Sequence, residues 1–169
     1  MIKFFTDVFK EPWASQVEGD AIHALNGNNI IWLDLDEHSH PCIINIVQEC
    51  SKYIDLSKAV GFELWMNSKD TATKESMSDW HVDSDEHGDE GIDRPRAFPI
   101  CSVVYYSKVE LLEGGDLVFR DTDHRIKPER NSLALFSPGV EHRVEPFIGI
   151  RTSIAVNFWN HKLEKYNGK

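Results

Sequence analysis

The stretch Asn131-Ser-Leu-Ala-Leu-Phe-Ser-Pro-Gly-Val-Glu-His142 shows the pattern that decides the fold. An apolar run leads into a Pro-Gly turn, and strand patterns resume at residues 141–144 and 151–159. A Pro-Gly pair favours a turn because proline restricts φ and glycine adopts positive φ without a steric penalty. We therefore expect this part of the chain to consist of short strands joined by tight turns.

Upstream of this stretch, the pattern of short strands and frequent breakers begins at about residue 60. Further strand patterns lie at 61–66, 98–106 and 116–119. A polar stretch that ends at Ser78 follows the first of them and is expected to be a loop, and Gly114-Gly115 predicts a turn.

The first third of the chain mixes strands with helices. Strand patterns at 2–9 and 29–35 alternate with helical patterns at 13–25 and from Pro41 onward. We predict a single domain (1–169), mainly β with supporting helices. An N-terminal helical layer with flanking strands (1–58) should cover one side of a closed or double-sheet β core (59–160).

Charge and composition exclude several classes of function. The 169 residues include 18 Lys and Arg against 28 Asp and Glu, a net charge of −10, and 41% of them are hydrophobic. This is the composition of a folded globular domain. The acid excess argues against general nucleic-acid binding, which needs a basic face, and against adsorption to an anionic membrane. A small basic site can still lie inside such a protein.

Cysteine usage and the N-terminus indicate a soluble intracellular protein. Cys42, Cys50 and Cys101 are an odd number without a C-x-x-C pair, so we expect reduced, mostly buried thiols. The first ten residues lack the pattern of a secretory signal. No stretch approaches the roughly 20 apolar residues of a membrane span.

A candidate metal site begins at His81. If this segment is extended, His81 and Asp83 project from one face, because strand side chains alternate. His142, which follows the Pro-Gly turn, is the best candidate for a third ligand. Two imidazoles and one carboxylate on one side of a metal leave the opposite positions open, as in non-haem Fe(II) oxygenases. The alternative is that His81 and Asp83 form an ordinary hydrogen-bonded pair.

The last strand carries a candidate anion receptor. Alternation places Arg151, Ser153, Ala155 and Asn157 on one face, and the apolar residues Ile154, Val156 and Phe158 on the other. A guanidinium offers two parallel donors to a carboxylate, and a neighbouring serine hydroxyl offers a third. The alternative role for Arg151 is a structural salt bridge.

Taken together and in this order, the segments from residue 80 to residue 159 resemble the Fe(II)- and 2-oxoglutarate-dependent dioxygenases, in their prolyl 4-hydroxylase-like branch. The elements that carry the resemblance are His81-x-Asp83, the Tyr105-Tyr106 strand, Glu113-Gly-Gly-Asp-Leu-Val-Phe119, the run that ends in His142, and Arg151-x-Ser153. Each is weak alone, and the full series is specific.

The resemblance implies a double-stranded β-helix, or jelly roll. It implies Fe(II) held by His81, Asp83 and His142, with 2-oxoglutarate and O2 as co-substrates and ascorbate to sustain turnover. It also implies that Arg151 receives the far carboxylate of 2-oxoglutarate. Ser153 or a strand tyrosine would assist; we expect Tyr106, which shares a face with Ser102 and Val104, with Tyr105 as the fallback.

Two segments depart from the family pattern. The strand before the H-x-D lacks the Tyr-x-x-Gly-like turn that often contacts the co-substrate. Trp65 and Asn67 share a face there and could substitute, although we expect Trp65 to pack in the core. The acidic loop at 84–93, which includes His87, is read as a solvated loop or, alternatively, as a mobile lid that selects a basic or polar substrate.

The resemblance favours hydroxylation of an unactivated C–H bond, with a prolyl residue in a peptide or protein as the expected substrate. One alternative is a hydroxylase of a free amino acid or other small metabolite. Another is a non-catalytic, cupin-like module that binds a metal or ligand. We expect no nucleic-acid or membrane partner, and a location in the cytoplasm of the cell that makes the protein, the host cell if it is viral.

Overall fold

The computed structural model describes residues 1–36, 40–75, 78–85 and 96–166. Its helices are α1 (Trp13–Leu25) and α2 (Pro41–Ser51), and a 3-10 turn, η2 (Glu164–Tyr166), lies near the C-terminus. Its strands are β1 (Ile2–Phe5), β2 (Ile30–Asp34), β3 (Gly61–Glu75), β4 (Cys101–Gly114), β5 (Leu117–Phe119), β6 (Arg125–Ile126), β7 (Ser132–Phe136), β8 (His142–Val144) and β9 (Phe147–Trp159). No helix in these ranges is long and apolar enough to cross a membrane.

The strands form two antiparallel sheets. The larger has the order β1-β7-β4-β9-β3-β2 and the smaller the order β6-β5-β8. Side chains from both sheets share one apolar cluster, which includes Tyr106, Phe119, Phe136 and Phe147. The sheets therefore pack face to face as a jelly roll, and the predicted fold class is confirmed.

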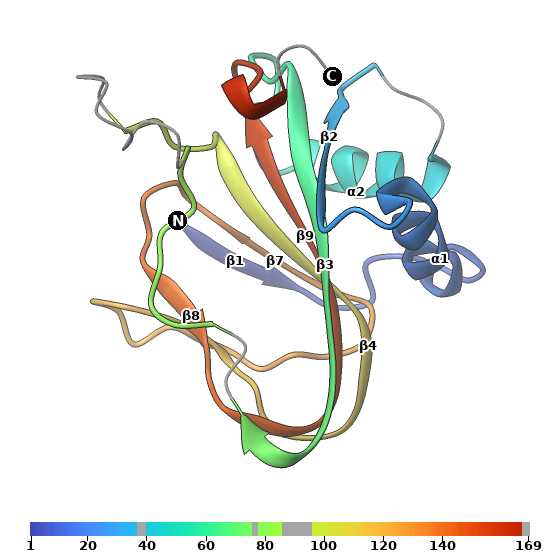
Figure 1. Cartoon of the computed structure of the whole chain (residues 1–169), viewed down its shortest axis with the longest axis vertical. Helices are drawn as coiled ribbons and strands as arrows, with labels where there is room; N and C mark the ends of the chain where they lie inside the picture. Colours follow the sequence, from blue (N-terminus) through green and yellow to red (C-terminus); the bar gives the residue numbers. More distant parts are fainter. Residues whose placement is uncertain (37–39, 76–77, 86–95, 167–169) are drawn as a thin grey trace.

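The two helices cover the other face of the large sheet (Figure 1). On α1 the buried residues Ala14, Val17, Ala21 and Leu25 recur at spacings of three and four, which places them on one side of the helix. Three of them, Val17, Ala21 and Leu25, pack with Ile43, Ile46 and Cys50 of α2 on apolar strand residues, including Ile154, Val156 and Phe158. The helical layer thus holds one face of β9 and leaves the other face to the jelly-roll interior.

Two local predictions need correction. The polar stretch after residue 66 is not a loop throughout, because β3 continues to Glu75 and pairs with β9. Backbone pairing needs no apolar side chains, and most side chains beyond Trp65 are exposed, so the hydrophobic pattern ends before the strand does. In the same way β4 continues past Tyr106 to Gly114. The two-residue strand β6 is too short to leave a pattern.

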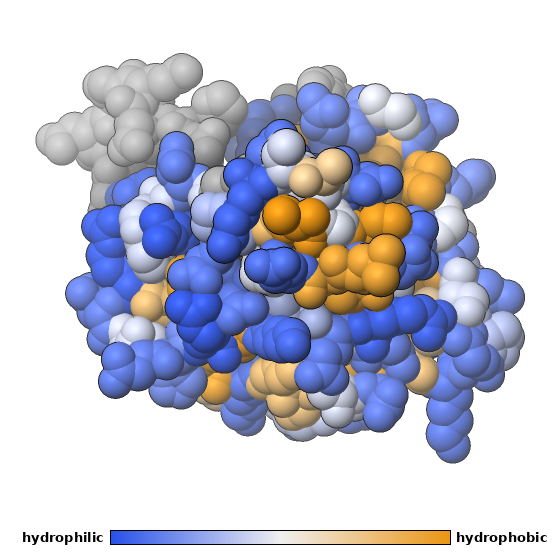
Figure 2. Space-filling view, turned by 90° about the horizontal axis from the view of Figure 1, so that it is seen from below, coloured by the Kyte–Doolittle hydropathy of each residue, from blue (hydrophilic) through white to orange (hydrophobic). Residues whose placement is uncertain are grey.

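The far ends of these long strands lie at the lower end of the molecule in Figure 1. Seen from below, this face is mostly hydrophilic, with hydrophobic residues gathered near its centre (Figure 2). Cys50 and Cys101 are free thiols and fully buried, as the sequence predicted.

Candidate active site

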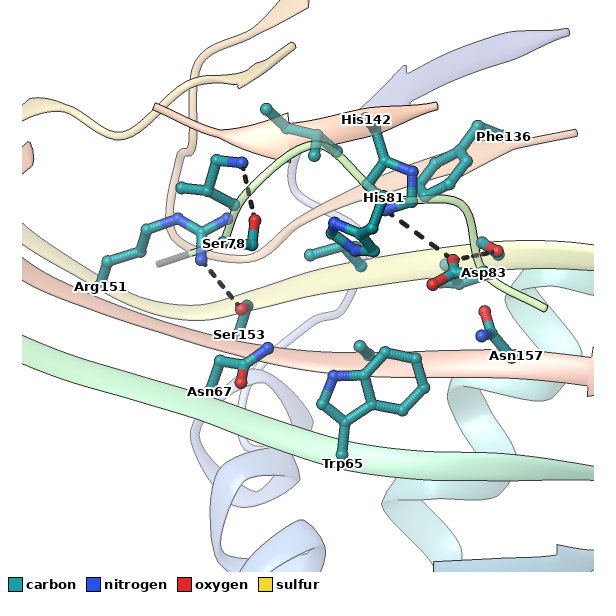
Figure 3. Close-up of a pocket in the computed structure, with 16 residues that line it drawn as sticks. Trp65, Asn67, Ser78, His81, Asp83, Phe136, His142, Arg151, Ser153 and Asn157 are labelled. Atoms are coloured by element: carbon teal, nitrogen blue, oxygen red, sulfur yellow. Dashed lines mark hydrogen bonds and ion pairs between the residues drawn. The ribbon is translucent and has the colours of Figure 1, made fainter. Parts of the chain in front are cut away.

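The structure brings His81, Asp83 and His142 together. The atoms that each could offer to a metal all lie within 4.8 Å of one another. The segment that holds His81 runs beside β8, and the backbones of His81 and His142 exchange hydrogen bonds of 3.0 and 2.9 Å. The two-residue step from His81 to Asp83 keeps the carboxylate on the same side, so the three side chains converge (Figure 3).

Each of the two imidazoles is held by the backbone carbonyl of the residue two positions earlier. Nδ1 of His81 lies 2.8 Å from the carbonyl oxygen of Asp79, and Nδ1 of His142 lies 2.9 Å from that of Val140. A carbonyl only accepts hydrogen bonds, so Nδ1 is the donor in each ring, and in this tautomer of a neutral imidazole Nε2 presents a lone pair. Partners of this kind fix the tautomer of metal-binding histidines.

The environment of His142 favours the neutral imidazole. The residue is 5% exposed, and its ring packs on the Phe136 ring at a centroid distance of 4.7 Å. Burial lowers the pKa of His142, although the Asp83 carboxylate, whose Oδ2 is 3.9 Å from Nε2, acts in the opposite direction. A neutral imidazole is the form that binds metal.

Asp83 has a partner that the sequence analysis did not assign. The Ser102 hydroxyl on β4 donates a hydrogen bond of 2.6 Å to Oδ2 of Asp83. This bond holds one carboxylate oxygen in place. Strand alternation puts Ser102 on the face that carries Tyr106, and that is the only signal in the sequence that points to it.

Arg151 lies buried on the inner face of β9, next to these residues. It is 2% exposed, and its Nη1 donates a hydrogen bond of 3.1 Å to Oγ of Ser153. Its guanidinium lies 5.0 Å from the centroid of the Tyr106 ring. Burial lowers the pKa of Arg151, because a charged guanidinium loses hydration in this position.

The two candidate tyrosines face opposite ways. Tyr106 lies in the jelly-roll interior beside Arg151, where burial raises its pKa. Tyr105 lies in the helix-side core and donates a hydrogen bond of 3.1 Å to Oδ1 of Asn131. The position of Tyr106 fits a role near the co-substrate, and that of Tyr105 does not.

One cavity, with an empty volume of about 550 Å³, is lined by His81, Asp83, Ser102, His142, Arg151 and Ser153, and not by either tyrosine. The inner face of β9 contributes Arg151, Ser153, Ala155 and Asn157, as the alternation predicted. Trp65 lines the cavity too and is only half-buried, so the expectation that it packs in the core is wrong. It pairs with Ala155 across β3 and β9 and shares that residue's inner face.

A wider groove opens from the same residues. It has an empty volume of about 1400 Å³ and is lined by the connection after α1, by β3 and by residues 81–84. Most of the acidic loop, at 86–95, lies outside the described residues, and so does His87. Asp85, at its start, is 8% exposed, and its backbone N–H bonds the Ala97 carbonyl at 2.9 Å.

The arrangement can hold a divalent metal with two neutral imidazoles and one carboxylate. A buried guanidinium with a hydroxyl beside it can hold a carboxylate group within the same cavity. The donor set suits iron(II) better than a site of thiolates or of carboxylates alone would.

Comparison with known proteins identifies relatives. The family model described as 2OG-Fe(II) oxygenase superfamily matches residues 70–161, which include all of the side chains above from His81 to Asn157. No curated protein sequence matches the chain.

Solved structures with the same fold include three prolyl hydroxylases. One from Trichoplax adhaerens, in complex with a hypoxia inducible factor peptide fragment, is 14% identical with a TM-score of 0.65, and the match covers 99% of this chain and 87% of that one. A Pseudomonas putida prolyl-4-hydroxylase is 14% identical with a TM-score of 0.62, with 95% and 88% covered. A viral collagen prolyl hydroxylase from Paramecium Bursaria Chlorella virus-1 is 13% identical with a TM-score of 0.60, with 92% and 88% covered.

Proposed function

Because the chain belongs to the 2OG-Fe(II) oxygenase superfamily, we propose that it hydroxylates an unactivated C–H bond of a prolyl residue in a peptide or protein. In the overall reaction, substrate, 2-oxoglutarate and O2 give hydroxylated substrate, succinate and CO2. The observation that carries the proposal is the presence of His81, Asp83, His142 and Arg151 around one cavity.

His81, Asp83 and His142 would hold the iron. With 2-oxoglutarate and O2, bound Fe(II) supplies the oxidising power for C–H cleavage. The protein supplies the ligand geometry: two carbonyls keep both Nε2 lone pairs aimed at one point, and Ser102 fixes the carboxylate of Asp83. Two neutral imidazoles and one carboxylate leave a site of net charge +1 with Fe(II), which favours an anionic co-substrate.

Arg151 would receive the far carboxylate of 2-oxoglutarate. Ser153, already bonded to Nη1, would offer its hydroxyl, and Tyr106 would close the other side of the guanidinium. Charge-assisted hydrogen bonds to the dianion would replace the hydrogen bonds to water that Arg151 loses on burial.

The proposal of a prolyl substrate in a peptide rests on two features. Solved structures that share this fold include prolyl hydroxylases, and one of them is in complex with a peptide fragment. The wide groove that meets His81 and Asp83 has room for an extended peptide beside the metal site.

The test is succinate formation from 2-oxoglutarate with Fe(II), O2 and ascorbate, first without and then with candidate substrates. We expect slow uncoupled turnover alone, and faster turnover with a mass gain of one oxygen when a proline-containing peptide is added. Stimulation by free amino acids and not by peptides would replace the peptide substrate with a small metabolite. A protein that binds metal but neither binds nor consumes 2-oxoglutarate would be a cupin-like module instead.

A further inference from the structure

Asn157 holds a buried acceptor that no described residue satisfies. The residue is 4% exposed, and Oδ1 of its side chain has no hydrogen-bond partner in the described part of the chain. A buried amide oxygen without a donor costs free energy, so native proteins seldom keep one without a use for it. Valine or leucine would fill this place in a β core without that cost.

The neighbours of Asn157 explain why its oxygen stays unsatisfied. Its cross-strand partners are Ser102 on β4 and Glu63 on β3. The Ser102 hydroxyl gives its only proton to Asp83. Glu63 is itself an acceptor and receives hydrogen bonds from Trp159 Nε1 at 3.2 Å and from the Tyr166 hydroxyl at 3.1 Å. A donor for Asn157 must therefore come from outside these strands.

Asn157 lies where the cavity and the wide groove meet. It lines both the cavity that holds Arg151 and the wide groove, together with Trp65, Asn67, His81 and Asp83. Arg151 and Ser153 line the cavity and not the groove. The candidate metal ligands lie between these two ends of β9, with Asn157 on the side away from Arg151 (Figure 3).

Distance along β9 separates Asn157 from the co-substrate. Six residues at about 3.3 Å each put it roughly 20 Å from Arg151 along the strand. A five-carbon dianion that spans from Arg151 to the metal ends before it reaches Asn157. A molecule that enters through the groove and lies against Trp65 would reach Asn157.

We infer that Asn157 is a specificity-determining residue, whose side-chain oxygen accepts a hydrogen bond from an N–H group of the substrate near the oxidised residue. A prolyl residue in a peptide has no N–H of its own, so there the donor is the N–H of a neighbouring residue. An asparagine amide complements a peptide group because each offers one acceptor beside a donor. The Trp65 ring would pack on the apolar part of the substrate. Two sources offer this chemistry, a peptide N–H and the ammonium group of a free amino acid, and the inference rests on the proposed function.

The test compares Asn157→Leu with Asn45→Leu. Leucine keeps the approximate size of asparagine and removes its polar atoms, and Asn45 is a half-buried asparagine on α2, away from both the cavity and the groove. Asn157→Ala is the second variant, in case leucine does not fit. The substrate probes are a proline-containing tetrapeptide with blocked ends, which offers only peptide N–H groups, and the free L-amino acids.

We expect Asn157→Leu and Asn157→Ala to lower kcat/KM for the preferred probe roughly 10- to 100-fold, because they leave a substrate donor buried without an acceptor. Uncoupled succinate formation and 2-oxoglutarate affinity should stay within about two-fold of wild type. The melting temperature of Asn157→Leu should not fall, because the replaced oxygen has no partner in the fold. Asn45→Leu should match wild type throughout.

Three results would overturn the inference. The first is an unchanged kcat/KM in both Asn157 variants. The second is a loss of uncoupled turnover in these variants as large as their loss of kcat/KM. The third is a wild-type enzyme that none of these N–H probes stimulates. The proposed function fails on a different observation, the absence of both uncoupled turnover and metal-dependent 2-oxoglutarate binding in the wild type.

Discussion

Replacement of Arg151 by methionine should separate binding of the co-substrate from folding. Methionine keeps much of the length and apolar volume of the side chain and removes the charge. If the guanidinium makes two charge-assisted hydrogen bonds to a carboxylate, each is worth about 1.5–3 kcal/mol. Their loss, about 3–6 kcal/mol together, weakens 2-oxoglutarate binding by a factor of roughly 10² to 10⁴.

The same change should not destabilise the metal-free, co-substrate-free protein. Arg151 is 2% exposed, and burial lowers its pKa, which means that the fold disfavours the charged form when no anion is bound. Loss of its packing on Tyr106 opposes this effect by about 1–2 kcal/mol. The two contributions oppose each other, so we expect a melting temperature within a few degrees of wild type.

The assay is calorimetric titration of 2-oxoglutarate into the Mn(II)-loaded protein, together with thermal unfolding with and without the co-substrate. The control is Arg125→Met. This change removes a surface arginine that forms ion pairs with Asp116 and Glu145 and does not line the cavity. It should leave 2-oxoglutarate affinity unchanged. The reasoning is refuted if Arg151→Met retains affinity within about three-fold, or if it unfolds at much lower temperature, since Arg151 would then be structural.

Three further predictions concern the residues around the site and the core. Ser102→Ala removes the hydrogen bond to Asp83 and should weaken Mn(II) binding roughly 10- to 100-fold in a metal titration; unchanged affinity would show that this bond does not hold the carboxylate. Glu63→Gln breaks an ion pair with Lys165 and should cost about 1–3 kcal/mol in urea unfolding, whereas no loss would show that the C-terminal segment does not depend on it. Burial raises the pKa of the Cys101 thiol to about 12, so at pH 8 about one thiol in 10⁴ is ionised. A thiol reagent should therefore modify Cys101 only after unfolding. Rapid labelling of Cys101 in the native protein would refute this prediction.

The fold was predictable where side chains face an apolar layer. The α1 bounds, the turn after β7 and the two faces of β9 follow from periodicity and breakers, because burial selects apolar residues at fixed intervals. The second half of β3 was not predictable in this way. Its strand is set by pairing with β9, and its exposed side chains leave no hydrophobic pattern.

The candidate site shows the same division. The side chains of His81, Asp83, His142 and Arg151 have distinctive chemistry, so spacing and resemblance were enough to assign them to one predicted site. Ser102 and Asn157 are common polar residues inside a strand pattern. Their roles depend on which residues pair with them on the neighbouring strands. Local sequence does not determine the register between strands that are distant in the chain.

Trp65 illustrates the remaining difficulty. A tryptophan in a strand is most often a core residue, and either face of β3 could have been the one that carries it. The pairing of Trp65 with Ala155 turns it toward the cavity. Only the three-dimensional register distinguishes a core tryptophan from one that lines a groove.

The central claim is that His81, Asp83 and His142 hold a metal to which 2-oxoglutarate binds with its far end on Arg151. The most direct test is calorimetric titration of 2-oxoglutarate into the wild-type protein, once with Mn(II) and once with a chelator. We predict saturable one-to-one binding with the metal and binding at least 100-fold weaker without it. Equal affinity in both titrations, or no binding in either, would contradict the account.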